Sequence, residues 1–177
     1  ILHQRANPGR RLTLKCPHHM AWLPALTEAL PEATIVQTHR DPVDCVPSEC
    51  KLILSLHGIS EKEFDWKRTV ESNHWKVHSY AQRSVAFADT PAGARIHHID
   101  YRQLVRDPVG VARDIHQRAN IAFTPSHQAT LSGFASENRQ HKHGKNQYSA
   151  TDFGLDPASL AKEFADYRER FIEGRAP

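Results

Sequence analysis

The segment Thr38-His39-Arg40-Asp41-Pro42, followed by Ser48, has the residue types of a phosphate-binding site. The β-branched run from Ala33 to His39 predicts a buried strand, and Asp41-Pro42 is typical of a helix start. Anions collect where a parallel strand ends and a helix begins, and an arginine guanidinium matches phosphate geometry. Ser48 lies about two helical turns beyond Asp41, on the same face. We therefore expect Arg40 and Ser48 to bind one phosphate. The alternative is a structural junction with a surface arginine.

Residues suited to group transfer stand upstream, at Lys15-Cys16-Pro17-His18-His19. Leucines alternate with polar residues from Arg11 to Lys15, which predicts a short strand that delivers Lys15 to the same sheet edge as Arg40. A lysine there can neutralise a transferring anionic group, and a nearby histidine can accept a proton close to neutral pH. Two partly exposed histidines at a helix start are the alternative.

Two further features could contact a nucleotide. The basic loop from Asn138 to Thr151 carries Lys142, Gly144 and Lys145, and its glycine permits close backbone approach to a phosphate. Tyr101 follows a predicted strand, where an aromatic ring can flank a base. A solvated loop and a packing aromatic are the alternatives.

The remaining pattern predicts strands that alternate with helices, hence an α/β fold with a parallel sheet flanked by helices. A helix from His18 to Leu30 should bury Trp22, Leu23, Leu26 and Leu30. A helix should run from Asp41-Pro42 to about His57 and stop at Gly58, and a polar helix or helix pair should lie between Glu61 and Ala88. We expect a strand from Ala94 to Tyr101 and helices that start at Asp107-Pro108, Thr124-Pro125 and Asp156-Pro157. The last of these helices should carry an apolar stripe of Leu160, Phe164, Tyr167 and Phe171.

Composition limits the class of protein. The chain has 177 residues, a formal net charge of +3 and 39% hydrophobic residues, which fits one domain and does not favour nucleic acid. No apolar run is long enough to span a membrane. The three cysteines, Cys16, Cys45 and Cys50, argue against a disulfide framework and for a reducing, cytoplasmic compartment. Their spacing with histidines predicts no metal site.

Taken together, these segments resemble the sulfotransferase superfamily, in particular a bacterial-type branch. The resemblance rests on short motifs in a specific order: Leu14-Lys15-Cys16-Pro17-His18-His19, Leu30-Pro31-Glu32-Ala33, His39-Arg40-Asp41-Pro42 with Ser48, Tyr101 to Pro108, and Phe164 to Phe171. It covers nearly the whole chain from Leu12 to Phe171. It implies a P-loop-NTPase-like sulfotransferase fold, with residues 1–177 forming the C-terminal part of a single domain.

The resemblance also implies roles for individual residues. Arg40 and Ser48 resemble the pair that binds the 3′-phosphate of 3′-phosphoadenosine 5′-phosphosulfate (PAPS). Lys15 would lie near the sulfuryl group, with His19, or its rival His18, as the base. Tyr101 would contact adenine. Lys142, Gly144 and Lys145 would form a remnant of the closing loop. The expected acceptor is a small molecule, lipid or glycan bearing a hydroxyl or amine, and no metal is required.

The sequence departs from the family pattern at the 5′-phosphosulfate loop. No window matches a glycine-rich Gly-x-x-x-x-Gly-Lys-[Ser/Thr] loop, and the chain begins at Ile1. We therefore expect upstream sequence to be missing, the chain alone to transfer little sulfate, and an open sheet edge to favour a homo-oligomer. A non-catalytic nucleotide-binding or scaffolding domain and a nucleotide kinase-like phosphotransferase are the alternatives. His39-Arg40-Asp41 also resembles a protein-kinase catalytic loop, but Pro42 stands where that loop has leucine, and the sequence has no Gly-rich nucleotide loop, so we reject that class.

Overall fold

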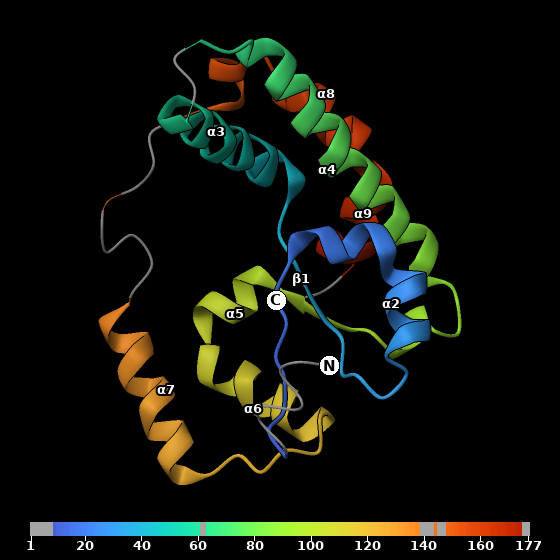
Figure 1. Ribbon diagram of the computed structural model, residues 1–177, viewed down its shortest axis with the longest axis vertical. Coiled ribbons are helices and arrows are strands. Elements are labelled where there is room, and N and C mark those ends of the chain that lie inside the picture. Colours follow the sequence, from blue (N-terminus) through green and yellow to red (C-terminus); the bar gives the residue numbers. More distant parts are fainter. Residues whose placement is uncertain (1–8, 61–62, 139–143, 145–147, 175–177) are drawn as a thin grey trace.

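The computed structural model describes residues 9–60, 63–138, 144 and 148–174. In chain order, its elements are η1 (Pro17–Trp22), α2 (Leu23–Ala29), β1 (Val36–His39), α3 (Pro42–Ser60), α4 (Trp66–Ala88), η2 (Gly93–Arg95), β2 (His97–Asp100), α5 (Tyr101–Arg106), α6 (Pro108–Arg118), α7 (Pro125–Glu137), η3 (Ala150–Phe153), α8 (Pro157–Glu163), α9 (Ala165–Arg168) and the π-helical turn η4 (Glu169–Glu173) (Figure 1).

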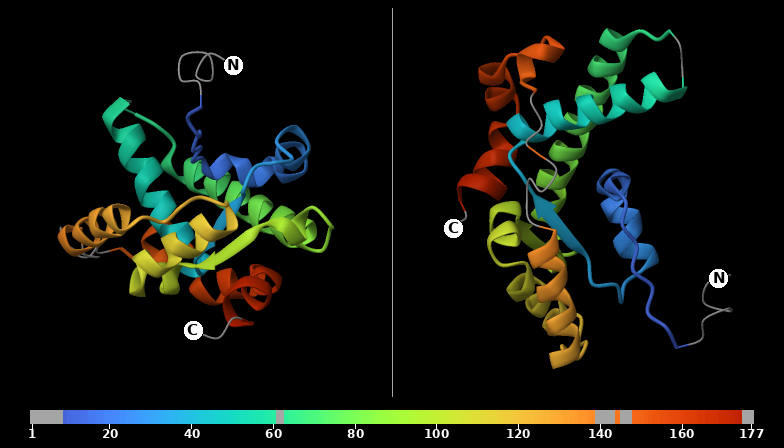
Figure 2. Two further views of the ribbon diagram at one scale, coloured as in Figure 1. Left: turned by 90° about the horizontal axis from the view of Figure 1, so that it is seen from below. Right: turned by 90° about the vertical axis from the view of Figure 1, so that its left-hand side faces the viewer.

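Strands β1 and β2 pair in parallel, as the α/β pattern predicts, with Val36 opposite His97 and His39 opposite Asp100. The connection between them runs through the long helices α3 and α4, which is the kind of crossover that parallel strands require. Figure 2 shows η1 and α2 on one side of the strands and the C-terminal segment α9–η4 on the other. The ends of both strands therefore lie between helices.

The proline-led helix starts are confirmed. The carboxylate of Asp107 accepts from the amide of Gly110 at 2.8 Å, and the hydroxyl of Thr124 accepts from the amide of His127 at 3.1 Å. Asp156 does the same for Ser159 at 2.8 Å. Each cap satisfies one of the amides that a helix N-terminus leaves without a partner.

The main core forms where the C-terminal segment packs on α3 and α4, and α8 and α9 lie along α4 (Figure 1). The predicted apolar stripe is confirmed, because Leu160, Phe164, Tyr167 and Phe171 are all buried. A smaller cluster of Leu23, Phe87 and Ile96 fills the space between α2, the end of α4 and the start of β2.

Three expected element boundaries are wrong. Strand β1 begins at Val36 and not at Ala33. Helix α3 continues through Gly58 to Ser60, because Gly58 does not adopt the left-handed conformation that would stop it. The strand before Tyr101 covers only His97–Asp100, and Tyr101 instead begins α5, since Asp100 caps that helix by accepting from the amide of Arg102 at 2.7 Å.

The N-terminal expectations are also corrected. Residues 11–16 form no strand, and Leu12 and Leu14 are exposed, so neither the hydrogen-bonded neighbour nor the buried face of a strand is present in the described structure. The expected helix from His18 begins as the 3₁₀ helix η1, whose tighter winding rotates the residues that follow. Leu23 is therefore buried, whereas Trp22 and Leu30 are exposed.

Candidate functional site

Arg40 lies between the last residue of β1 and the cap of α3, as the sequence predicts. Its guanidinium carbon lies 5.2 Å from the centre of the Tyr101 ring, a cation–π contact that holds the side chain over the start of α5. It also pairs with Asp44 at 3.7 Å between Nη2 and Oδ2. The Arg40 side chain keeps 39% of its surface exposed, so its donor fork remains accessible. The structure therefore brings together two residues predicted for a nucleotide site, Arg40 and Tyr101.

Asp41 caps α3, and this changes the expected anion site. Its carboxylate accepts from the amide of Val43 at 3.0 Å, and its carbonyl accepts from the amides of Asp44 and Cys45, both at 3.0 Å. The expected cap at Asp41 is therefore confirmed, and a carboxylate of the chain already accepts from the amide of Val43. An anion at this junction would depend on the guanidinium of Arg40.

Ser48 lies in the second turn of α3 and is half-buried. It follows Pro47, which lacks an N–H and so leaves the carbonyl of Val43 without its usual helical donor.

In the same turns of α3, burial raises the pKa of the Cys45 thiol to about 11. Arg40 lowers this pKa and neighbouring carboxylates raise it, both by smaller amounts. Cys45 is therefore a protonated thiol at neutral pH.

The residues predicted for group transfer, Lys15, His18 and His19, do not share polar contacts with Arg40 and Ser48 in the described structure. Lys15 and His18 are exposed and His19 is half-buried. The ring of His18 meets that of Tyr80 edge to face at 6.0 Å, and its Nδ1 lies 3.7 Å from the Cys16 Sγ. Among the described residues, no hydrogen bond or ion pair joins this segment to Arg40 or Ser48.

A buried polar cluster around His39 was missed by sequence reasoning. His39 is fully buried, its Nδ1 lies 2.7 Å from the Tyr167 hydroxyl, and its Nε2 lies 2.8 Å from Nδ1 of His98. Its ring stacks on Phe171 at 4.2 Å with an interplanar angle of 10°. Burial also raises the pKa of Tyr167, so its hydroxyl stays protonated. The apolar stripe in the sequence predicted that Tyr167 and Phe171 are buried, but it did not predict that they pack on His39.

The expected closing loop is described only in part. Gly144 is exposed and has a φ of +93°, a conformation that favours glycine, while Lys142 and Lys145 lie outside the described residues.

In the part of the chain that the structure describes, no group of three acidic, histidine or cysteine residues could hold a metal ion. No described helix is long and apolar enough to cross a membrane. The three cysteines are free.

Comparison with known proteins identifies the family to which the chain belongs. Residues 1–125 match the sequence profile described as the sulfotransferase family, and the chain belongs to that family. Its structure matches the crystal structure of the sulfotransferase STF9 from Mycobacterium avium with a TM-score of 0.82 and 25% sequence identity. The match covers 96% of this chain and 43% of the mycobacterial chain, so the protein spans less than half of that sulfotransferase. No curated protein matches the chain.

Proposed function

We propose that this chain carries the 3′-phosphate half of a PAPS site and belongs to a sulfotransferase that acts on a hydroxyl or amine acceptor. The main support is the placement of Arg40, whose guanidinium lies over Tyr101 at the junction of β1 and α3. A partly exposed arginine beside an aromatic ring suits a ligand that joins a phosphate to a purine. Family membership supports the same chemistry.

The proposed roles follow this geometry and the family resemblance. Arg40 and Ser48 bind the 3′-phosphate, and Tyr101 contacts the adenine. The ion pair of Arg40 with Asp44 is long, at 3.7 Å, and the Asp44 side chain is 63% exposed. A phosphate can therefore replace Asp44 at low cost, because an exposed pair of this kind contributes little. Gly144, with Lys142 and Lys145, would close over the phosphate.

The proposed reaction is an in-line transfer. The acceptor oxygen or nitrogen attacks sulfur while the bond from sulfur to the phosphate oxygen breaks, and adenosine 3′,5′-bisphosphate leaves. His19, or His18 as its rival, accepts the acceptor proton, and Lys15 neutralises charge on the sulfuryl group. Positioning and charge supply most of the rate in such transfers. A non-catalytic nucleotide-binding or scaffolding role is the second candidate, supported by the exposure of Lys15 and His18.

Ligand-induced stabilisation tests the nucleotide assignment. We expect adenosine 3′,5′-bisphosphate to raise the Tm of the protein, because a ligand that binds only the folded state stabilises it. The Arg40→Ala variant should lose most of this shift, whereas Arg106→Ala, which removes an exposed arginine from the end of α5, should keep it. Adenosine 5′-monophosphate, which lacks the 3′-phosphate, should produce a smaller shift. Equal shifts for both variants, with intact folding by circular dichroism, would show that Arg40 does not bind this phosphate.

A further inference from the structure

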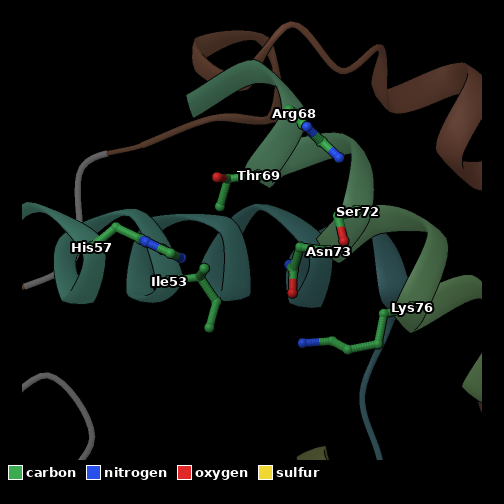
Figure 3. Close-up of a pocket in the computed structure, with 7 residues that line it drawn as sticks. All are labelled: Ile53, His57, Arg68, Thr69, Ser72, Asn73 and Lys76. Carbon is green, nitrogen blue, oxygen red and sulfur yellow. The ribbon is translucent and has the colours of Figure 1, made fainter. Parts of the chain in front are cut away.

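A pocket lined mostly by polar residues lies between the C-terminal half of α3 and the N-terminal half of α4 (Figure 3). Its volume is about 310 Å³, at the lower end of the range for small-molecule sites. Figure 3 shows Ile53 and His57 on α3 and the other five lining residues on α4. The lining residues are Ile53, His57, Arg68, Thr69, Ser72, Asn73 and Lys76.

The lining is cationic. Arg68 and Lys76 bring two positive charges, His57 adds an imidazole, and none of the lining residues is acidic. Lys76 is partly neutralised, because its Nζ lies 2.7 Å from Oε1 of Glu49. Arg68 is exposed, and its backbone amide is the group that bonds to Asp65 at the start of α4. Its guanidinium is thus the strongest donor for an anion at the pocket mouth.

Asn73 provides an acceptor at the base of the pocket. Its side chain is 4% exposed, and its Nδ2 donates to the Cys50 Sγ at 3.6 Å. Its Oδ1 is buried and has no hydrogen-bond partner among the described residues. A buried carbonyl oxygen without a donor is unfavourable, because it has lost its hydrogen bonds to water. A ligand hydroxyl that donates to Oδ1 would remove this cost.

We propose that this pocket binds a small carboxylic acid that also carries hydroxyl groups, such as a uronic acid. The carboxylate pairs with Arg68 at the mouth, and one ring hydroxyl donates to Oδ1 of Asn73. Ser72 and Thr69 offer further oxygen atoms along the wall. This inference concerns binding alone and does not depend on the proposed PAPS site.

Titration with glucuronic acid, followed by the NMR signals of backbone and side-chain amides, tests the proposal. We expect shifts of the Asn73 side-chain amide and of α4 amides near Arg68. The Arg68→Gln variant should bind roughly tenfold more weakly, the effect of losing one charge-assisted hydrogen bond. The matched control is Lys67→Gln, which removes a neighbouring exposed cation that does not line the pocket and should leave the affinity unchanged.

Neutral and purely inorganic probes separate the two parts of the recognition. Glucose should bind more weakly than glucuronic acid, because it lacks the anion, and inorganic phosphate should leave the Asn73 side-chain signal in place. The proposal is overturned if glucuronic acid shifts no pocket signal, if both arginine and lysine variants weaken binding equally, or if glucose or phosphate binds as well as glucuronic acid.

Discussion

Asp41 accepts a hydrogen bond from Arg168, 127 residues further along the chain, with 3.1 Å between Oδ2 and Nε. Two residues earlier, His39 contacts the Tyr167 hydroxyl at 2.7 Å. The segment at the end of β1 and the segment at the end of the chain therefore form one packed unit. The carboxylate that caps α3 therefore also holds α9 in place. Asp41 thus has a structural role beside Arg40, the proposed phosphate ligand.

The ion pair of Asp41 and Arg168 should contribute measurably to stability. Both side chains are 27% exposed, so water screens the pair less than it screens most surface pairs. We expect Arg168→Ala to lower the free energy of unfolding by about 1–2 kcal/mol. Arg170→Ala is the control, because its partner Asp89 is 68% exposed, and it should cost less than about 0.5 kcal/mol. Urea unfolding measures both, and equal losses would contradict the prediction.

The hydroxyl of Tyr167 should stabilise the buried imidazole of His39. Tyr167→Phe removes this partner and keeps the ring that packs on Phe171, at 5.0 Å between ring centres. We expect a loss of about 1–3 kcal/mol, since the variant removes a hydrogen bond between two buried polar groups. Tyr80→Phe, at a half-buried ring on α4, should change the stability by under about 0.5 kcal/mol. Thermal and urea unfolding of the two variants decide the outcome, and a neutral Tyr167→Phe would show that the contact with His39 contributes nothing.

Local rules predicted much of this fold because they act over a few residues. Asp107-Pro108 and Thr124-Pro125 specify helix starts by capping chemistry alone, and the structure has them there. The strand expected at residues 11–15 failed because a strand requires a neighbour, which is a non-local property. Within the candidate site, the sequence placed Arg40 and Tyr101 at strand ends. It gave no indication of His39 and its contact with Tyr167, which depends on residues 128 positions apart.

The half-buried thiol of Cys45 should make the protein less stable in alkali. Burial raises its folded-state pKa from 9.0 to about 11, so the folded state favours the neutral thiol. Its contribution is therefore complete below pH 9 and is lost as pH rises toward 11, when only the unfolded chain ionises freely. At pH 10 the loss amounts to about 1.4 kcal/mol.

A Cys45→Ala variant checks this assignment. The difference in unfolding free energy between pH 8 and pH 10 should be smaller in the variant than in the wild-type protein by about 1.4 kcal/mol. Cys16→Ser, which alters an exposed cysteine, should keep the wild-type pH dependence. If Cys45→Ala retains the full wild-type slope, another group causes the alkaline loss.

The link between β1 and the C-terminal helix has a consequence for biosynthesis. A ribosome releases a chain from its N-terminus first, and Asp41 leaves it long before Arg168 has been made. The cap of α3 can form early, because it needs only the amide of Val43. The buried face of β1 must wait for Tyr167 and Phe171, whose rings cover His39. The nascent protein therefore leaves the imidazole of His39 uncovered until α9 and η4 emerge, and the packing around β1 is completed only then.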